Sequence, residues 1–73
     1  MKLTFDERML MTLYSTGTRG GTIDNLKNMR ICISHDETFL RGLTDAVLSK
    51  LDLMTEDDFE NAVFKGLEEL NAD

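Results

Sequence analysis

One segment decides how the first half of the chain folds: Leu13-Tyr14-Ser15-Thr16-Gly17-Thr18-Arg19-Gly20-Gly21-Thr22-Ile23. It interrupts the apolar periodicity on either side of it and is rich in glycine. Gly17 can adopt the positive φ that ends a helix, and Thr22 has the side chain of a helix N-cap. The segment therefore predicts two helices that fold back on each other, one near residues 4–15 and one near residues 22–33.

Capping patterns mark the starts of the other helices. The pairs Thr4–Glu7 and Ser34–Glu37 have the spacing of a capping box, in which each residue satisfies a backbone N–H of the other. Thr55 precedes a run of acidic residues, which is typical of the first turn of a helix. These patterns predict further helices near residues 35–51 and 55–70.

The chain contains no proline and almost no strand pattern. We therefore expect an all-α fold, a small compact bundle of four short helices that forms one domain over residues 1–73. The predicted inner stripes of the first, third and fourth helices are Phe5, Met9, Leu10, Leu13; Phe39, Leu40, Leu43, Val47, Leu51; and Phe59, Val63, Leu67, Leu70. Gly42 and Gly66 interrupt the third and fourth helices. Either they let these two helices approach each other closely, or they are merely tolerated there.

Few residues are available for catalysis or for binding a metal. Cys32 is the only cysteine and His35 the only histidine, which is too few for a disulfide or a zinc site. His35 stands next to Asp36 and Glu37 and could form an acid–base pair with them, but a surface histidine at the start of a helix is the simpler interpretation. We therefore expect neither an enzyme nor a cofactor. The unpaired cysteine, together with the absence of a signal peptide and of an apolar run of about 20 residues, indicates a cytoplasmic protein without a membrane segment.

Charge is distributed unevenly along the chain, whose net charge is −6. Residues 1–50 are close to neutral, whereas residues 51–73 hold Lys65 as their one basic residue among many acidic ones. The dipole of the last helix accounts for the acids of its first turn but not for Glu60, Glu68 and Glu69. These three form either a solvated face or a surface for a basic protein partner.

Two apolar residues, Met11 and Phe64, fall outside the predicted inner stripes. They are either ordinary exposed side chains or parts of a contact patch for the same protein partner.

The second helix offers an alternative function. In a helix-turn-helix arrangement it would present residue types that suit bases and phosphates, namely Arg19, Thr22, Asn25, Lys27, Asn28 and Arg30. The excess of acidic residues opposes this hypothesis, because phosphate neutralisation supplies most of the affinity for DNA.

The chain also resembles a family of small bacterial proteins, the putative transposon-transfer assisting proteins. The residues that carry the resemblance are Phe5, Glu7, Leu13, Tyr14, Thr16, Gly17, Arg19, Thr22, Ile23, Leu26, Leu51, Met54, Thr55 and Phe59. The most specific part is the string formed by Tyr14, Thr16, Gly17, Arg19 and Thr22, whose spacing suits a structural role. The resemblance implies a gene on conjugative mobile elements and an accessory role in their transfer. Our leading hypothesis is that the protein is not an enzyme and acts by contact with a protein of the transfer machinery.

Overall fold

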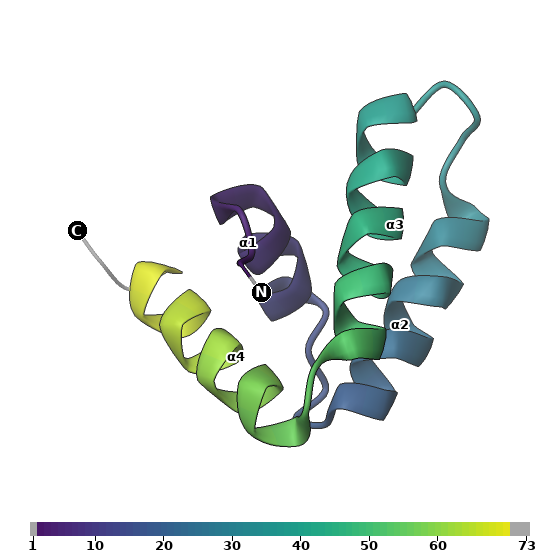
Figure 1. The fold of residues 1–73 in the computed structure, drawn as a ribbon. Coiled ribbons are helices and arrows are strands. Elements are labelled where there is room, and N and C mark those ends of the chain that lie inside the picture. The colour runs from purple at the N-terminus through teal and green to yellow at the C-terminus, as the bar shows by residue number, and fades with distance from the viewer. Residues whose placement is uncertain (1, 71–73) are drawn as a thin grey trace.

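A computed structural model describes residues 2–70 and places them in four helices. These are α1 (Phe5–Leu13), α2 (Arg19–Cys32), α3 (Thr38–Leu53) and α4 (Glu56–Leu70), arranged as Figure 1 shows. No strand occurs between residues 2 and 70. The predicted all-α bundle is therefore confirmed.

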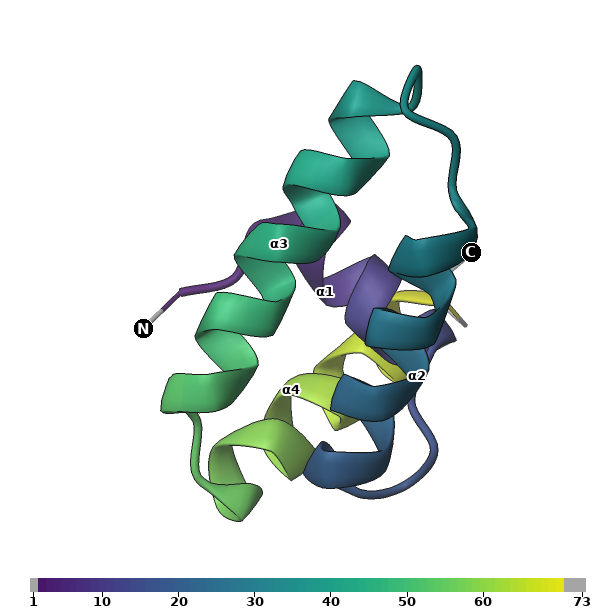
Figure 2. The same ribbon diagram turned by 90° about the vertical axis from the view of Figure 1, so that its right-hand side faces the viewer.

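α1 is the helix that joins the two halves of the bundle. It packs against both α3 and α4, whereas α2 packs mainly against α3 (Figures 1 and 2). The expectation that the first two helices fold back on each other as a pair is therefore wrong. The linker after α1 is long enough to carry α2 across to α3, where its apolar face is buried.

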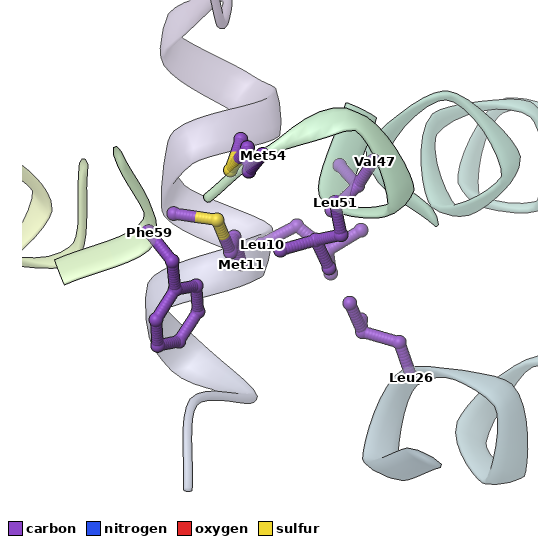
Figure 3. Close-up of a cluster of buried hydrophobic side chains, with 7 residues drawn as sticks. All are labelled: Leu10, Met11, Leu26, Val47, Leu51, Met54 and Phe59. Carbon is purple, nitrogen blue, oxygen red and sulfur yellow. The ribbon is translucent and has the colours of Figure 1, made fainter. Parts of the chain in front are cut away.

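Seven buried apolar side chains form the core: Leu10, Met11, Leu26, Val47, Leu51, Met54 and Phe59 (Figure 3). All four helices contribute to this cluster, and Met54 adds a side chain from the residue that ends α3. Burying one such side chain stabilises a fold by about 1.5–3 kcal/mol. The burial of these seven side chains thus holds the four helices together.

The buried face of α1 differs from the predicted stripe. Phe5 and Leu13 are exposed, while Glu7, Met11 and Thr12 are buried together with part of the predicted stripe. Glu7 and Thr12 satisfy their polar atoms inside the protein, so they can occupy an inner face that a hydrophobic pattern does not reveal.

Three predicted inner residues of the other helices are exposed as well. Phe39 in α3 and Leu67 in α4 lie roughly 80° around their helices from the fully buried Val47 and Phe59, respectively. Short helices in a bundle of this size bury only a narrow stripe, so residues at its margin remain accessible. Leu70, at the end of α4, is also exposed.

Two of the predicted caps are confirmed. The N–H of Thr4 donates to Glu7 Oε1 at 2.8 Å, and the N–H of Glu7 donates to Thr4 Oγ1 at 3.2 Å. Thr55 and Asp58 form an equivalent pair at the start of α4, with distances of 3.3 and 3.1 Å. α1 therefore begins where the sequence places it, although it ends at Leu13 rather than near residue 15.

The predicted start of α3 is wrong. Ser34 Oγ accepts a hydrogen bond from the N–H of Asp36 at 3.2 Å, and the N–H of Glu37 donates to the Ser34 carbonyl at 3.1 Å. These bonds close a local turn, so Ser34 does not cap a helix. α3 begins at Thr38 and continues to Leu53, past the predicted end at residue 51.

The start of α2 also differs from the prediction. Its N-cap is Thr18, whose Oγ1 accepts a hydrogen bond from the N–H of Gly21 at 3.1 Å, and the helix begins at Arg19 rather than Thr22. Gly17 does have a positive φ, of 99°. It lies beyond the end of α1 and directly before the cap, so it shapes the entry into α2 instead of ending α1.

Gly66 lies where two helices approach each other closely, and these helices are α1 and α4. A Cβ atom at Gly66 would lie 1.9 Å from Thr12 Oγ1 and 3.0 Å from Thr12 Cβ. A Cβ atom at Gly42, by contrast, would meet nothing within 4 Å. The predicted contact of α3 and α4 along these two glycines is therefore wrong, because Gly66 faces α1 and Gly42 faces open space.

Candidate partner-binding surface

One face of α4 carries exposed apolar and acidic side chains side by side. Glu60, Phe64 and Glu68 follow each other at intervals of one turn, with Leu67 beside them; we call these four residues the outer stripe. Phe64 is 63% exposed and Leu67 is 48% exposed. Within residues 2–70 neither Glu60 nor Glu68 forms an ion pair. Contacts within residues 2–70 thus do not explain why the outer stripe combines apolar and acidic side chains.

Glu69 does not belong to this surface. Its Oε1 lies 2.6 Å from Arg8 Nη2 and accepts a hydrogen bond from Arg8 Nε at 2.9 Å, so it ties the last turn of α4 to α1. The expectation that Glu69 is an unengaged acid is wrong. The pairing partner lies on the first helix, where no local pattern connects it to Glu69.

Met11 is excluded from the partner surface as well. Its side chain has no exposed area and lies in the core cluster close to Phe59 (Figure 3). The patch predicted from Met11 and Phe64 together is therefore wrong. α1 has neighbours on both sides, which encloses Met11, while α4 has α1 as its main neighbour and leaves Phe64 accessible.

Two of the three acids in the first turn of α4 have local partners. Glu56 Oε1 lies 3.6 Å from Arg19 Nε, and Asp58 completes the capping pair with Thr55. They also complement the positive end of the helix dipole. Asp57 is exposed in the same turn and forms no ion pair within residues 2–70. The outer stripe and Asp57 are therefore the acidic parts of α4 that can meet another molecule.

Arg19 fixes the junction between α3 and α4. Its Nη1 donates to the Leu51 carbonyl at 2.8 Å, at the end of α3, while its Nε faces Glu56 at the start of α4. The Leu51 carbonyl also accepts a hydrogen bond from the N–H of Met54 at 3.3 Å, so the guanidinium adds a second donor to this carbonyl. The first residue of α2 therefore sets the turn between the last two helices.

The other residues of the string hold the linker together. Thr22 is fully buried; its Oγ1 donates to the Thr18 carbonyl at 2.7 Å and accepts from the N–H of Thr16 at 3.3 Å. The Tyr14 carbonyl accepts a hydrogen bond from Asn25 Nδ2 at 2.9 Å. Tyr14, Thr16 and Thr22 thus make contacts that shape the linker.

Most residues of the DNA-contact hypothesis are engaged within the protein. Thr22 is buried, Arg19 and Asn25 hold backbone carbonyls, and Arg30 Nη2 donates to Asp45 Oδ2 at 2.9 Å. The guanidinium of Arg30 lowers the pKa of the Asp45 carboxyl by this hydrogen bond. Lys27 and Asn28 are exposed on α2. Thr22 is therefore corrected from a candidate DNA contact to a buried structural residue.

Glu7 is the centre of a buried polar cluster that the sequence does not reveal. Its Oε1 accepts from Lys50 Nζ at 2.7 Å as well as from the N–H of Thr4. Burial favours the neutral carboxyl and raises its pKa, but the hydrogen bonds from Lys50 and Thr4 outweigh this effect, so the pKa of Glu7 lies below its usual value. Lys50 thereby joins the start of α1 to α3.

Acid is expected to weaken this cluster. Because the pKa of Glu7 is lower in the folded protein than its ordinary value of 4.5, ionised Glu7 stabilises the fold above that pH, and this stabilisation is lost as the pH falls through the folded pKa. Urea unfolding of the wild type and of Glu7→Gln, followed from neutral pH into this acidic range, tests the expectation. The difference in stability between the two proteins should shrink as the pH falls. A difference that stays constant would contradict it.

Two further features concern ligands and membranes. Within residues 2–70 no three His, Cys, Asp or Glu side chains are grouped so that they could hold a metal ion. None of the helices in this range combines the length and apolar character that crossing a membrane requires.

Comparison with known proteins identifies the family. A model of the family described as "Putative transposon-transfer assisting protein" matches residues 3–65. Searches of curated proteins and of solved structures returned no match. The matched range includes the string from Tyr14 to Thr22, the residues at the junction of α3 and α4, and the first half of α4. Since it spans most of the 73 residues, the chain belongs to the family of putative transposon-transfer assisting proteins.

Proposed function

We propose that this protein assists the transfer of a conjugative transposon by binding a basic protein of the transfer machinery through the outer stripe of α4. The observation that carries the proposal is Phe64, a large aromatic side chain that is 63% exposed between Glu60 and Glu68. Aromatic side chains are enriched in the centres of protein interfaces, where a rim of charges sets the choice of partner. The family description, an assisting protein, agrees with a role in binding rather than catalysis.

Charge favours a basic protein over other partners. Glu60 and Glu68 flank Phe64 and repel phosphates, so this face of α4 suits lysine- or arginine-rich surfaces. A second copy of the chain, which carries the same net charge of −6, would place acids against acids. The outer stripe therefore fits an apolar depression bordered by basic side chains.

The experiment starts by capturing the tagged protein from cells that carry the mobile element and identifying what binds. Affinity for the captured protein is then measured for the wild type and for Glu60→Gln/Glu68→Gln. We expect the variant to bind roughly tenfold more weakly at low ionic strength, with the difference narrowing in high salt. Phe64→Ala should weaken binding at both salt concentrations, because its contribution is apolar burial.

A matched control removes the same charge elsewhere. Asp36 and Glu37 are exposed in the turn before α3, so Asp36→Asn/Glu37→Gln changes the net charge equally without touching α4. This control should bind like the wild type. Equal weakening in the control and the outer-stripe variant would reduce the effect to net charge and contradict the proposal.

DNA binding is tested in the same series by titrating duplex and single-stranded DNA at two salt concentrations. We expect no saturable binding, because four of the six α2 candidates have partners inside the protein or are buried. Salt-sensitive DNA binding that is lost in Lys27→Gln, while the outer-stripe variants remain active, would favour the DNA-binding alternative instead.

A further inference from the structure

A pocket opens on a different face of α4 from the outer stripe. Its volume is about 430 Å³, within the range of small-ligand sites. It lies where the segment before α1, α1 itself, the end of α3 and α4 meet, and its lining residues are Lys2, Leu3, Arg8, Met54, Asp58, Asn61, Ala62 and Lys65. Asp58, Asn61, Ala62 and Lys65 recur at helical spacing, so α4 forms one wall.

The pocket gathers positive charge in a protein that is acidic overall. Lys2, Arg8 and Lys65 line it together with the carboxylate of Asp58, and the charge of Arg8 is balanced by Glu69. Asp58 already accepts a hydrogen bond from the N–H of Thr55 at 3.3 Å. Within residues 2–70 neither Lys2 nor Lys65 forms an ion pair. Two ammonium groups are thus left to meet an anion from outside.

Contacts behind the pocket hold its walls in place. Lys50 Nζ donates to the Lys2 carbonyl at 2.9 Å and to Glu7, which fixes the segment before α1 against α3. Arg8 is held by Glu69 and donates through Nη1 to the Leu3 carbonyl at 3.4 Å. The cationic rim is therefore built on anchored backbone, which reduces the cost of ordering it when a ligand binds.

The interior of the pocket is partly apolar. Met54 belongs to the buried core, and the partly buried Leu3 and Ala62 pack against that core. A ligand that fills this space needs an apolar group next to its negative charge. A simple phosphate or a DNA backbone has no such group, and its denser charge would be repelled by Asp58.

We propose that this pocket binds an acidic peptide segment, with a carboxylate against Lys2 and Lys65 and an aliphatic side chain against Leu3, Met54 and Ala62. The segment belongs to a partner protein and would be recognised by alternating glutamate and leucine-like residues. The proposal is independent of the outer stripe, which lies on another face of α4 and has the opposite charge. The two surfaces would let the protein contact one basic and one acidic region at the same time.

The test uses an acetylated, amidated peptide in which three glutamates alternate with two leucines. Amide signals of the isotope-labelled protein are followed by NMR as the peptide is added. We expect saturable shifts at the pocket residues on α1 and α4, and no such shifts with the same peptide carrying glutamine in place of glutamate. Shifts confined to other surfaces, equal binding of the glutamine peptide, or no binding of the acidic peptide would each overturn the proposal. The proposal would also be overturned if inorganic phosphate or a single-stranded oligonucleotide shifted the same pocket signals with an affinity equal to that of the peptide.

Matched variants assign the effect to the two lysines. Lys2→Gln/Lys65→Gln should weaken the peptide about tenfold, whereas Lys27→Gln/Arg41→Gln, which removes the same charge outside the pocket, should leave it unchanged. Equal weakening in both pairs would overturn the site. Glu60→Gln/Glu68→Gln should still bind the peptide. The experiment therefore distinguishes a failure of the outer-stripe hypothesis from a failure of the pocket hypothesis.

Discussion

Replacing Met11 with alanine is expected to lower the free energy of unfolding by about 3 kcal/mol. Met11 has no exposed area, and its side chain lies among Leu10, Met54 and Phe59 at the centre of the core (Figure 3). Truncation removes apolar contacts and leaves a cavity that helices anchored on two sides of α1 cannot close. Small domains have a total stability of only about 5–15 kcal/mol, so the change takes a large share of it.

Urea or thermal unfolding followed by circular dichroism measures this loss. Met9→Ala is the matched control, because it makes the same change in the same helix at a residue outside the core cluster. We expect the control to cost less than about 1 kcal/mol. Equal costs at both methionines would show that the inner face of α1 is not the one described.

Alanine at Gly66 is expected to destabilise the protein by about 2 kcal/mol, although alanine is normally the better helix former. The new Cβ would lie 1.9 Å from Thr12 Oγ1, and rotating that side chain does not help because Thr12 Cβ is itself only 3.0 Å away. Thr12 Oγ1 is also engaged, since it donates to the Arg8 carbonyl at 2.7 Å. α1 and α4 would have to separate.

Gly42 provides the control within the same protein. It also lies inside a helix, but a Cβ there meets nothing within 4 Å, so Gly42→Ala should stabilise the protein by about 0.5–1 kcal/mol. Combining Gly66→Ala with Thr12→Ala should recover part of the loss, as a double-mutant cycle would show. If Gly66→Ala proved as stabilising as Gly42→Ala, the close approach of α1 and α4 would be refuted.

The parts of the fold that sequence predicts well are those set by neighbours in the chain. The capping pair of Thr4 and Glu7 and the cap at Thr55 need only residues within one helical turn, and both are present. The helical class follows from the same local patterns. Even here a competing local bond can win, as it does at Ser34, whose hydroxyl accepts from the N–H of Asp36.

The orientation of α1 could not be predicted from apolar residues alone. Phe5 and Leu13 suggest one face, but the buried face includes Glu7 and Thr12 beside Met11. Glu7 can be buried because Lys50 reaches it from α3, and nothing in the sequence near Glu7 indicates that lysine. Tertiary contacts thus allow polar residues to be buried and turn the helix away from its apparent apolar side.

The sequence predicts only part of the candidate surface, because the rest depends on contacts between residues far apart in the chain. Phe64, Glu60 and Glu68 are exposed as expected because α4 covers the bundle from one side. The sequence does not connect Glu69 to its partner Arg8, because Arg8 lies 61 residues earlier in the chain. The pocket was not foreseen at all, since Lys2 and Lys65 come together only when α1 and α4 dock.

The central place of α1 has a consequence for the order in which the protein assembles. α2 and α3 are consecutive helices and can pair early, because closing a short loop costs little entropy. The docking of α4 on α1, through pairs such as Arg8 and Glu69, closes a much longer loop and belongs to a later step. During synthesis α1 leaves the ribosome before α4, so α4 cannot cover Met11 until it has left the ribosome as well. Assembly is thus gated by the helix that carries the proposed partner surface, and a chain interrupted before α4 would expose its core to chaperones and proteases.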